Sequence, residues 1–279
     1  MGDVRLGVHT GSFRALRREA GVDPIQTLID ALRACDVREC ELSAEQVEAQ
    51  FGTAHAGHHT VAKMSPQMMR RELRKWRLRT PASYYRAIGD RFRKAGVAIY
   101  AYSYGSDRSF TDQEIDYGFT AARALGADIV TASTTLDVAK RIAPIADRHR
   151  MVVALHGRSP GDDPNALGTP QSFAATLQMS KYFKVSLDVG QFTAASLDAA
   201  GYLREHHQTI TTVLLNDRRR ERRDDLPWGY GDTPIREILQ LVKREAWPIR
   251  AYVAIDYASM NGPIDEVKKC LAYAAQALT

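Results

Sequence analysis

The sequence predicts one domain over residues 1–279 with the (β/α)8 barrel fold, a TIM barrel. Three observations support this prediction. The length of 279 residues fits a barrel of roughly 250 residues. Short β-branched runs alternate with helical patterns, and most of these runs recur at intervals of about thirty residues, the size of one βαβ unit. No linker-like stretch divides the chain, so a single domain is expected.

Eight strands are expected from the short apolar runs. Several of them, such as residues 151–155, are apolar at nearly every position, which is typical of parallel strands buried on both faces. The expected strands are residues 5–8, 39–42, 97–102, 128–132, 151–155, 184–188, 211–215 and 251–256.

Helical patterns fill the gaps between these strands, and several have recognisable ends. Asp23 is a good N-cap for a helix over residues 23–34, with Pro24 at its first position. Thr111 and Glu114 have capping-box spacing, and Gly126 is placed to end the helix that they begin.

Two further helices are expected at residues 233–244 and 263–278. The gap between the second and third strands is unusually long. It predicts an insertion that consists of a loop and an added helix.

Composition excludes several classes of protein. Apolar residues make up 44% and charged residues 25% of the chain, with 19 Gly and 11 Pro, which excludes collagen and low-complexity disorder. No apolar stretch is long enough for a membrane-spanning helix. The 3 cysteines lack the spacing of a zinc site or a disulfide framework. A cytoplasmic location is expected, and a trimmed export signal stays open.

In barrels of this kind the ligand lies at the C-terminal ends of the strands. Polar residues that close the expected strands are therefore the first candidates for a binding site. They are His9, Glu41, Tyr104, Ser133, His156, Asp188, Asn216, Asp217 and Asp256.

Several motifs carry a resemblance to a known family. The clearest are residues 71–78, 131–135, 187–195, 217–219, 227–234 and 266–270. On these stretches the chain resembles the xylose-isomerase-like barrels, in particular the sugar phosphate isomerase/epimerase family, over nearly its whole length. The resemblance implies a carbohydrate ligand, and in many relatives a dimer or tetramer.

The resemblance also implies a divalent metal (Mn, Mg, Zn or Co) at the barrel mouth. The family's ligands come from the ends of the fifth to eighth strands, and a metal there polarises a sugar carbonyl. Here His156 and Asp188 occupy the first two ligand positions. The third is Leu214 and the fourth is Ala254, neither of which can bind a metal. A degenerate metal site with weak or no metal binding is therefore expected.

The first interpretation is an enzyme that catalyses isomerisation, epimerisation or elimination of a sugar, polyol or keto-sugar. His156, Asp188 and Asp256 are its candidate catalytic residues, because imidazole and carboxylate groups move protons near neutral pH. The candidate substrate-binding residues are Glu41, Arg158, Gln191, Asn216, Asp217, Arg218 and Trp228.

Two other interpretations stay open. A non-catalytic homologue that serves as a sugar-binding or partner subunit would also explain Leu214 and Ala254. The superfamily includes an abasic-site endonuclease, and basic runs at residues 70–79 and 218–223 could contact phosphates. Acidic residues interrupt both runs, and the formal net charge is only +5, so we do not expect nucleic acid to be the ligand.

Overall fold

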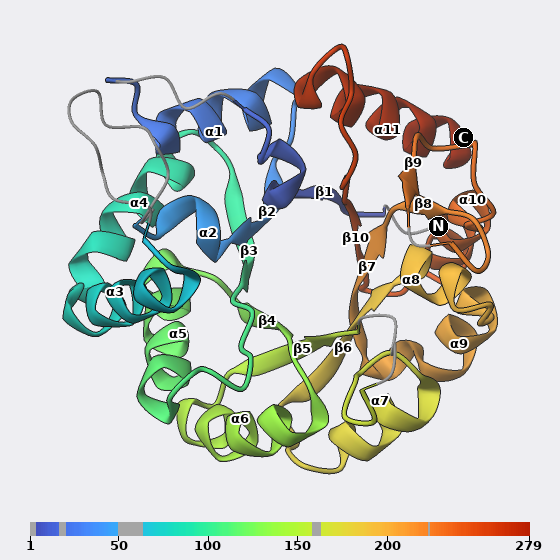
Figure 1. The fold of residues 1–279 in the computed structure, drawn as a ribbon. Helices are drawn as coiled ribbons and strands as arrows, with labels where there is room; N and C mark the ends of the chain where they lie inside the picture. The colour runs from blue at the N-terminus through green and yellow to red at the C-terminus, as the bar shows by residue number, and fades with distance from the viewer. Residues whose placement is uncertain (1–3, 17–20, 50–63, 158–162, 223) are drawn as a thin grey trace.

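The computed structural model describes residues 4–16, 21–49, 64–157, 163–222 and 224–279. Within these ranges parallel strands close into an eight-stranded barrel in the order β1-β10-β7-β6-β5-β4-β3-β2, and helices surround it (Figure 1). This confirms the predicted (β/α)8 fold. The barrel strands are β1 (Leu6–His9), β2 (Glu39–Ser43), β3 (Ala98–Ser103), β4 (Ile129–Ser133), β5 (Val152–His156), β6 (Phe183–Asp188), β7 (Ile210–Leu215) and β10 (Arg250–Val253).

The helices form the outer ring, and a short hairpin lies between β7 and α10. The hairpin pairs β8 (Asp217–Arg218) with β9 (Asp225–Leu226) in antiparallel fashion. The described α-helices are α1 (Pro24–Ala34), α2 (Ala44–Val47), α3 (Pro66–Arg79), α4 (Ala82–Lys94), α5 (Asp112–Leu125), α6 (Leu136–His149), α7 (Pro170–Leu177), α8 (Val189–Ala194), α9 (Ala199–His206), α10 (Ile235–Arg244) and α11 (Pro263–Ala277). None of them has the length and apolar character needed to cross a bilayer.

The helix ends follow from the residues that flank them. The Asp23 carboxylate accepts hydrogen bonds from the N–H groups of Ile25 and Gln26, so α1 begins where its sequence predicts. Thr111 and Glu114 form a complete capping box at the start of α5. Gly126 ends that helix with a φ of 82°, a left-handed conformation that glycine adopts without steric cost.

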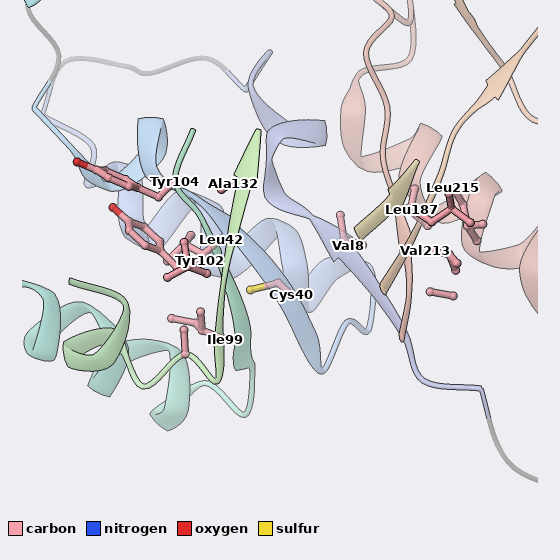
Figure 2. Close-up of a cluster of buried hydrophobic side chains, with 14 of the residues drawn as sticks. Val8, Cys40, Leu42, Ile99, Tyr102, Tyr104, Ala132, Leu187, Val213 and Leu215 are labelled. Atoms are coloured by element: carbon pink, nitrogen blue, oxygen red, sulfur yellow. The ribbon is translucent and has the colours of Figure 1, made fainter. Parts of the chain in front are cut away.

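Each strand divides its side chains between two apolar cores. The outward-facing residues pack against the helices, and Figure 2 shows Val8, Cys40 and Leu42 together with Val213 and Leu215 in this outer core. The inward-facing residues fill the barrel; they are Tyr100, Ala101, Ile129, Ala154, Leu214 and Tyr252.

The amino-terminal end of the barrel is plugged. The Arg250 guanidinium lies 3.7 Å from the centre of the Tyr100 ring. The Tyr252 hydroxyl donates to Glu39 Oε1 at 2.7 Å. Because these side chains fill the interior at this end, a ligand reaches the barrel axis only from the carboxyl ends of the strands.

The last barrel strand is shorter than predicted. We expected residues 251–256, but β10 ends at Val253. Ala254 N still donates to Leu215 O at 2.9 Å, but the N–H groups that follow turn to other partners: Ile255 N donates to Ser12 Oγ at 3.0 Å and Asp256 N donates to Asp225 Oδ2 at 3.1 Å. Asp256 therefore lies on a loop above the strand and not in its inward row.

Between β2 and β3 the structure describes α2, α3 and α4, while residues 50–63 lie outside the described ranges. Three of the basic residues of α3 face the protein. Arg70 and Arg74 contact the buried Glu114 at 2.6 Å and 2.8 Å, and Arg77 forms two hydrogen bonds of 2.7 Å to Glu48. These arginines are thus engaged by carboxylates of the chain itself.

Candidate functional site

A cavity of about 580 Å³ opens at the carboxyl ends of the barrel strands. This volume lies within the range of small-molecule sites, roughly 300–1,000 Å³. Its walls combine polar and apolar groups in similar measure and come from nearly every strand of the barrel. Among the residues that line it are His9, Arg14, Ser43, Ser103, Ser133, His156, Asp188, Gln191, Leu214, Asn216, Arg218, Asp225, Ala254 and Asp256.

His156 and Asp188 meet at the ends of β5 and β6. His156 Nε2 lies 3.1 Å from Asp188 Oδ2. The other Asp188 oxygen accepts the N–H of Gln191 at 2.8 Å and caps α8. A carboxylate in this position orients the imidazole and stabilises its protonated form, which is the arrangement of a general base.

Asn216 supports this pair from β7. Its Nδ2 donates to Asp188 Oδ2 at 3.4 Å, and its Oδ1 accepts the N–H of Gly190 at 2.9 Å. An added Cβ at Gly190 would lie 2.0 Å from Asn216 Oδ1, so glycine is required for this close approach. Asp188 is therefore fixed from β5, β7 and the start of α8.

Glu41 lies beneath the cavity floor and does not line it. Its side chain is fully buried, and neither oxygen accepts a hydrogen bond of good geometry from a described residue. Burial raises the pKa of Glu41 to about 7, although His156 and the hydroxyls of Thr131 and Ser103 act to lower it. His9 Nε2 is 3.9 Å from Glu41 Oε1.

Asp225 and Arg14 line the cavity, and the sequence analysis missed both. Asp225 lies on β9, where its Oδ1 accepts from Arg218 Nε at 2.5 Å. Burial raises the pKa of Asp225 to about 6, with Arg218 opposing and Asp188 and Asp256 adding to the rise. Only the position of Asp225 in a short hairpin brings it here, and the local sequence carries no signal for that hairpin beyond a break in a basic run.

Arg14 follows β1 and pairs with Asp256 at the rim. Arg14 Nη1 and Asp256 Oδ1 are 2.5 Å apart, and both side chains are more than half exposed. Asp256 thus lines the cavity, but it does so from the outer edge and in an ion pair.

Of the candidate residues, Tyr104, Asp217 and Trp228 lie outside the cavity, as Glu41 does. Asp217 Oδ2 accepts the N–H groups of Gly229 and Gly231 at 2.8 Å and 2.9 Å, and its Oδ1 accepts that of Thr233 at 3.2 Å. Trp228 packs edge to face on Tyr273, with ring centres 5.7 Å apart. Asp217 and Trp228 are therefore both placed to support the loop that follows β9. Arg158 lies outside the described residues.

The four positions at which the resemblance implies metal ligands lie on neighbouring strands. His156, Asp188, Leu214 and Ala254 all line the cavity, so the two apolar residues face the space where a metal would sit. Within the described part of the chain, no group of three His, Cys, Asp or Glu side chains is placed to hold a metal ion. The residues present therefore do not fit a cage of four ligands.

The chain shares its fold with solved barrels described as xylose isomerase domain proteins and sugar phosphate isomerase/epimerases. No protein-family model matches the chain, and no curated protein matches it. The statement therefore rests on likeness to solved structures.

Three solved structures illustrate the likeness. D-psicose 3-epimerase from Clostridium cellulolyticum has a TM-score of 0.67 at 10% identity, over 98% of this chain and 99% of that one. The probable 3-DHS dehydratase from Bacillus anthracis has a TM-score of 0.65 at 13% identity, over 99% of each chain. A sugar phosphate isomerase/epimerase from Parabacteroides distasonis has a TM-score of 0.62 at 14% identity, over 100% of this chain and 96% of that one.

Proposed function

We propose that this protein acts on a sugar, polyol or keto-sugar by proton transfer at the barrel mouth, as an isomerase, an epimerase or a lyase. The His156–Asp188 pair in the polar cavity is the observation that carries the proposal. The similar structures include proteins described as epimerases, an isomerase/epimerase and a dehydratase. Isomerisation, epimerisation and elimination next to a carbonyl can each proceed by transfer of a proton between the substrate and a protein group.

His156 serves as the general base in this proposal. Its Nε2 is engaged by Asp188, which leaves Nδ1 as the ring nitrogen that accepts the substrate proton. The imidazolium that forms is then stabilised by the adjacent Asp188 carboxylate. Asn216 and Gln191 flank the pair on the cavity wall, where amide groups suit the hydroxyls of a sugar.

The activity test is a screen of aldoses, ketoses and keto-glycosides, followed by variants of the pair. His156→Gln and Asp188→Asn should each lower turnover about 100-fold or more, because a positioned general base contributes about 10²–10⁴-fold. His149→Gln is the matched control. His149 forms a pair of 2.8 Å with Asp116, but it lies on α6, outside the residues that line the cavity. Full activity in both variants of the pair would contradict the proposal.

We further propose that a divalent metal binds weakly or not at all, because Leu214 and Ala254 offer no ligand atom. Metal analysis of freshly purified protein should then find Mn, Mg, Zn and Co well below one ion per chain. The double variant Leu214→His and Ala254→Glu should gain metal affinity, since it adds an imidazole and a carboxylate beside His156 and Asp188. One tightly held ion in the unmodified chain would contradict this expectation.

A sugar-binding or partner subunit without catalysis is the second candidate. The replacement of two ligand positions by Leu214 and Ala254, both facing the cavity, favours it. In that case a sugar should raise the melting temperature of the protein. The NMR spectrum of the sugar should stay unchanged over prolonged incubation with the protein, because the sugar is not converted.

A further inference from the structure

A second histidine–carboxylate pair lies across the same cavity from the first. His9 ends β1 and lines the cavity, and Glu41 lies beside it on β2, where the two residues are register partners. In the strand order of the closed barrel, β1 is four strands from β5 in either direction, and β2 is likewise four strands from β6. Figure 1 shows β1 and β2 on one side of the barrel and β5 and β6 on the other.

The environment of Glu41 favours its neutral, protonated form. An ionised carboxylate without hydrogen-bond donors is costly to bury, and both Glu41 oxygens lack such donors of good geometry among the described residues. The groups around it are His9 from β1 and His156 from β5, with the hydroxyls of Ser103 from β3 and Thr131 from β4. His9 Nε2 lies 3.9 Å from Glu41 Oε1, so the two groups must come closer before a protonated Glu41 donates to Nε2, and that hydrogen bond would place the ring proton of His9 on Nδ1.

His9 is correspondingly neutral. Burial lowers the pKa of His9 to about 4, and the nearby His156 and Arg14 add to the decrease, while Asp188 and Glu45 oppose it. Of the two groups, Glu41 therefore keeps a proton up to a higher pH than His9 does. The pair across the barrel has the opposite character, because Asp188 accepts hydrogen bonds from Gln191 and Asn216, as an ionised carboxylate does.

We propose that His9 and Glu41 form a second acid–base pair of this site, so that a carbon held between the two pairs is deprotonated from one face and protonated from the other. This inference rests on the proposed function. It narrows that function to inversion of a stereocentre next to a carbonyl, as in a keto-sugar.

The step balances without a further reactant. The C–H bond breaks as a ring nitrogen of His156 takes the proton, and the electron pair of that bond moves onto the neighbouring carbonyl oxygen. A new C–H bond then forms on the other face as His9 gives up its proton, Glu41 passes a proton to Nε2 of His9, and the carbonyl is restored. One proton leaves the substrate and one arrives.

The catalytic test uses D-psicose, D-fructose and D-tagatose in D2O. The unmodified protein should form an epimer that carries deuterium at the inverted carbon. His9→Gln should lower inversion about 100-fold or more and should leave exchange of the C–H proton with solvent within about 10-fold, because His156 still removes it. Inversion by His9→Gln at the rate of the unmodified protein would overturn the proposal.

A second measurement needs no substrate. The ring tautomer of His9, read by ¹⁵N NMR, should change between about pH 6 and about pH 8 as Glu41 loses its proton. Glu41→Gln should abolish that change, whereas Glu39→Gln, two residues earlier on the same face of β2, should retain it. A His9 tautomer that does not depend on Glu41 would contradict the proposal that His9 and Glu41 act as an acid–base pair. If no keto-sugar reacts but the tautomer changes as expected, the proposed function fails and the pair stands.

Discussion

Carboxylates that look equivalent along the sequence have different roles in this fold. Asp188 holds His156, Asp225 holds Arg218, and Asp256 pairs with Arg14 at the solvent edge. Asp217 instead accepts three backbone N–H groups and does not line the cavity. The position of a carboxylate at a strand end predicts that it lies near the mouth, but its partners decide whether it contacts a ligand.

At the residue scale, Asp217→Ala should lower the free energy of unfolding by about 3 kcal/mol. The change removes three hydrogen bonds and leaves the N–H groups of Gly229, Gly231 and Thr233 without that acceptor. Urea denaturation followed by circular dichroism measures the loss. Asp256→Ala is the control and should cost less than about 0.5 kcal/mol, because an exposed ion pair contributes little. Equal effects of the two variants would show that the hydrogen bonds of Asp217 do not stabilise the loop.

At the scale of single elements, α3 is attached to the barrel through charge. Glu114 at the start of α5 is fully buried and receives Arg70 and Arg74, while Arg77 reaches Glu48 and its guanidinium lies over the Phe110 ring. These hydrogen bonds hold the pKa of Glu114 at about 2 against the effect of burial. Ion pairs of this kind cost desolvation, so most of their effect appears when one partner is removed.

Glu114→Gln should therefore destabilise the protein by about 3 kcal/mol at neutral pH, because it leaves the partly buried guanidinium groups of Arg70 and Arg74 without their buried counter-charge. The folded pKa of Glu114 lies below its unfolded value, so its contribution is present above about pH 4.5 and is lost as the pH falls toward 2. Unfolding by urea at several pH values should show that the difference in free energy of unfolding between the variant and the unmodified protein shrinks as the pH falls from about 4.5 toward 2. Glu72→Gln is the control: it removes an exposed ion pair with Lys75 on α3 and should change the free energy of unfolding little.

The elements were largely predictable because their signals are local. Strand positions follow from short apolar runs, and the starts of α1 and α5 follow from Asp23 and from the capping box at Thr111. The early end of β10 was not predictable, because the partners that take its next N–H groups, Ser12 and Asp225, are distant in the sequence.

The candidate site was predictable in part for the same reason. His156 and Asp188 end neighbouring strands, so the fold rule alone brings them together. Asp225 enters the cavity through a hairpin of two-residue strands. Arg14 enters it through the short turn after β1. Neither connection has a periodic pattern, so long-range packing and not local preference places these two residues.

At the scale of the whole molecule, the barrel exists only if its first and last strands meet. β1 supplies this closure, because it pairs with β10 on one side and β2 on the other. The seam is tight at Gly7, which is the register partner of Tyr252. An added Cβ there would lie 2.3 Å from the Tyr252 ring and 2.6 Å from the Glu39 carbonyl oxygen.

Gly7→Ala should therefore destabilise the entire barrel and not a single element. The Tyr252 ring is fully buried, and the Glu39 oxygen belongs to the backbone, so neither neighbour yields easily and an overpacking cost of about 2–3 kcal/mol is expected. Because closure joins all eight strands, thermal unfolding should remain one transition, shifted to lower temperature and observed equally by near- and far-ultraviolet circular dichroism. Gly105→Ala is the control, since the added Cβ would lie 3.9 Å from the Ser133 carbonyl oxygen, an ordinary contact. If Gly7→Ala melted β1 alone and left the other strands folded, the barrel would be stable while open, and closure would not govern its stability.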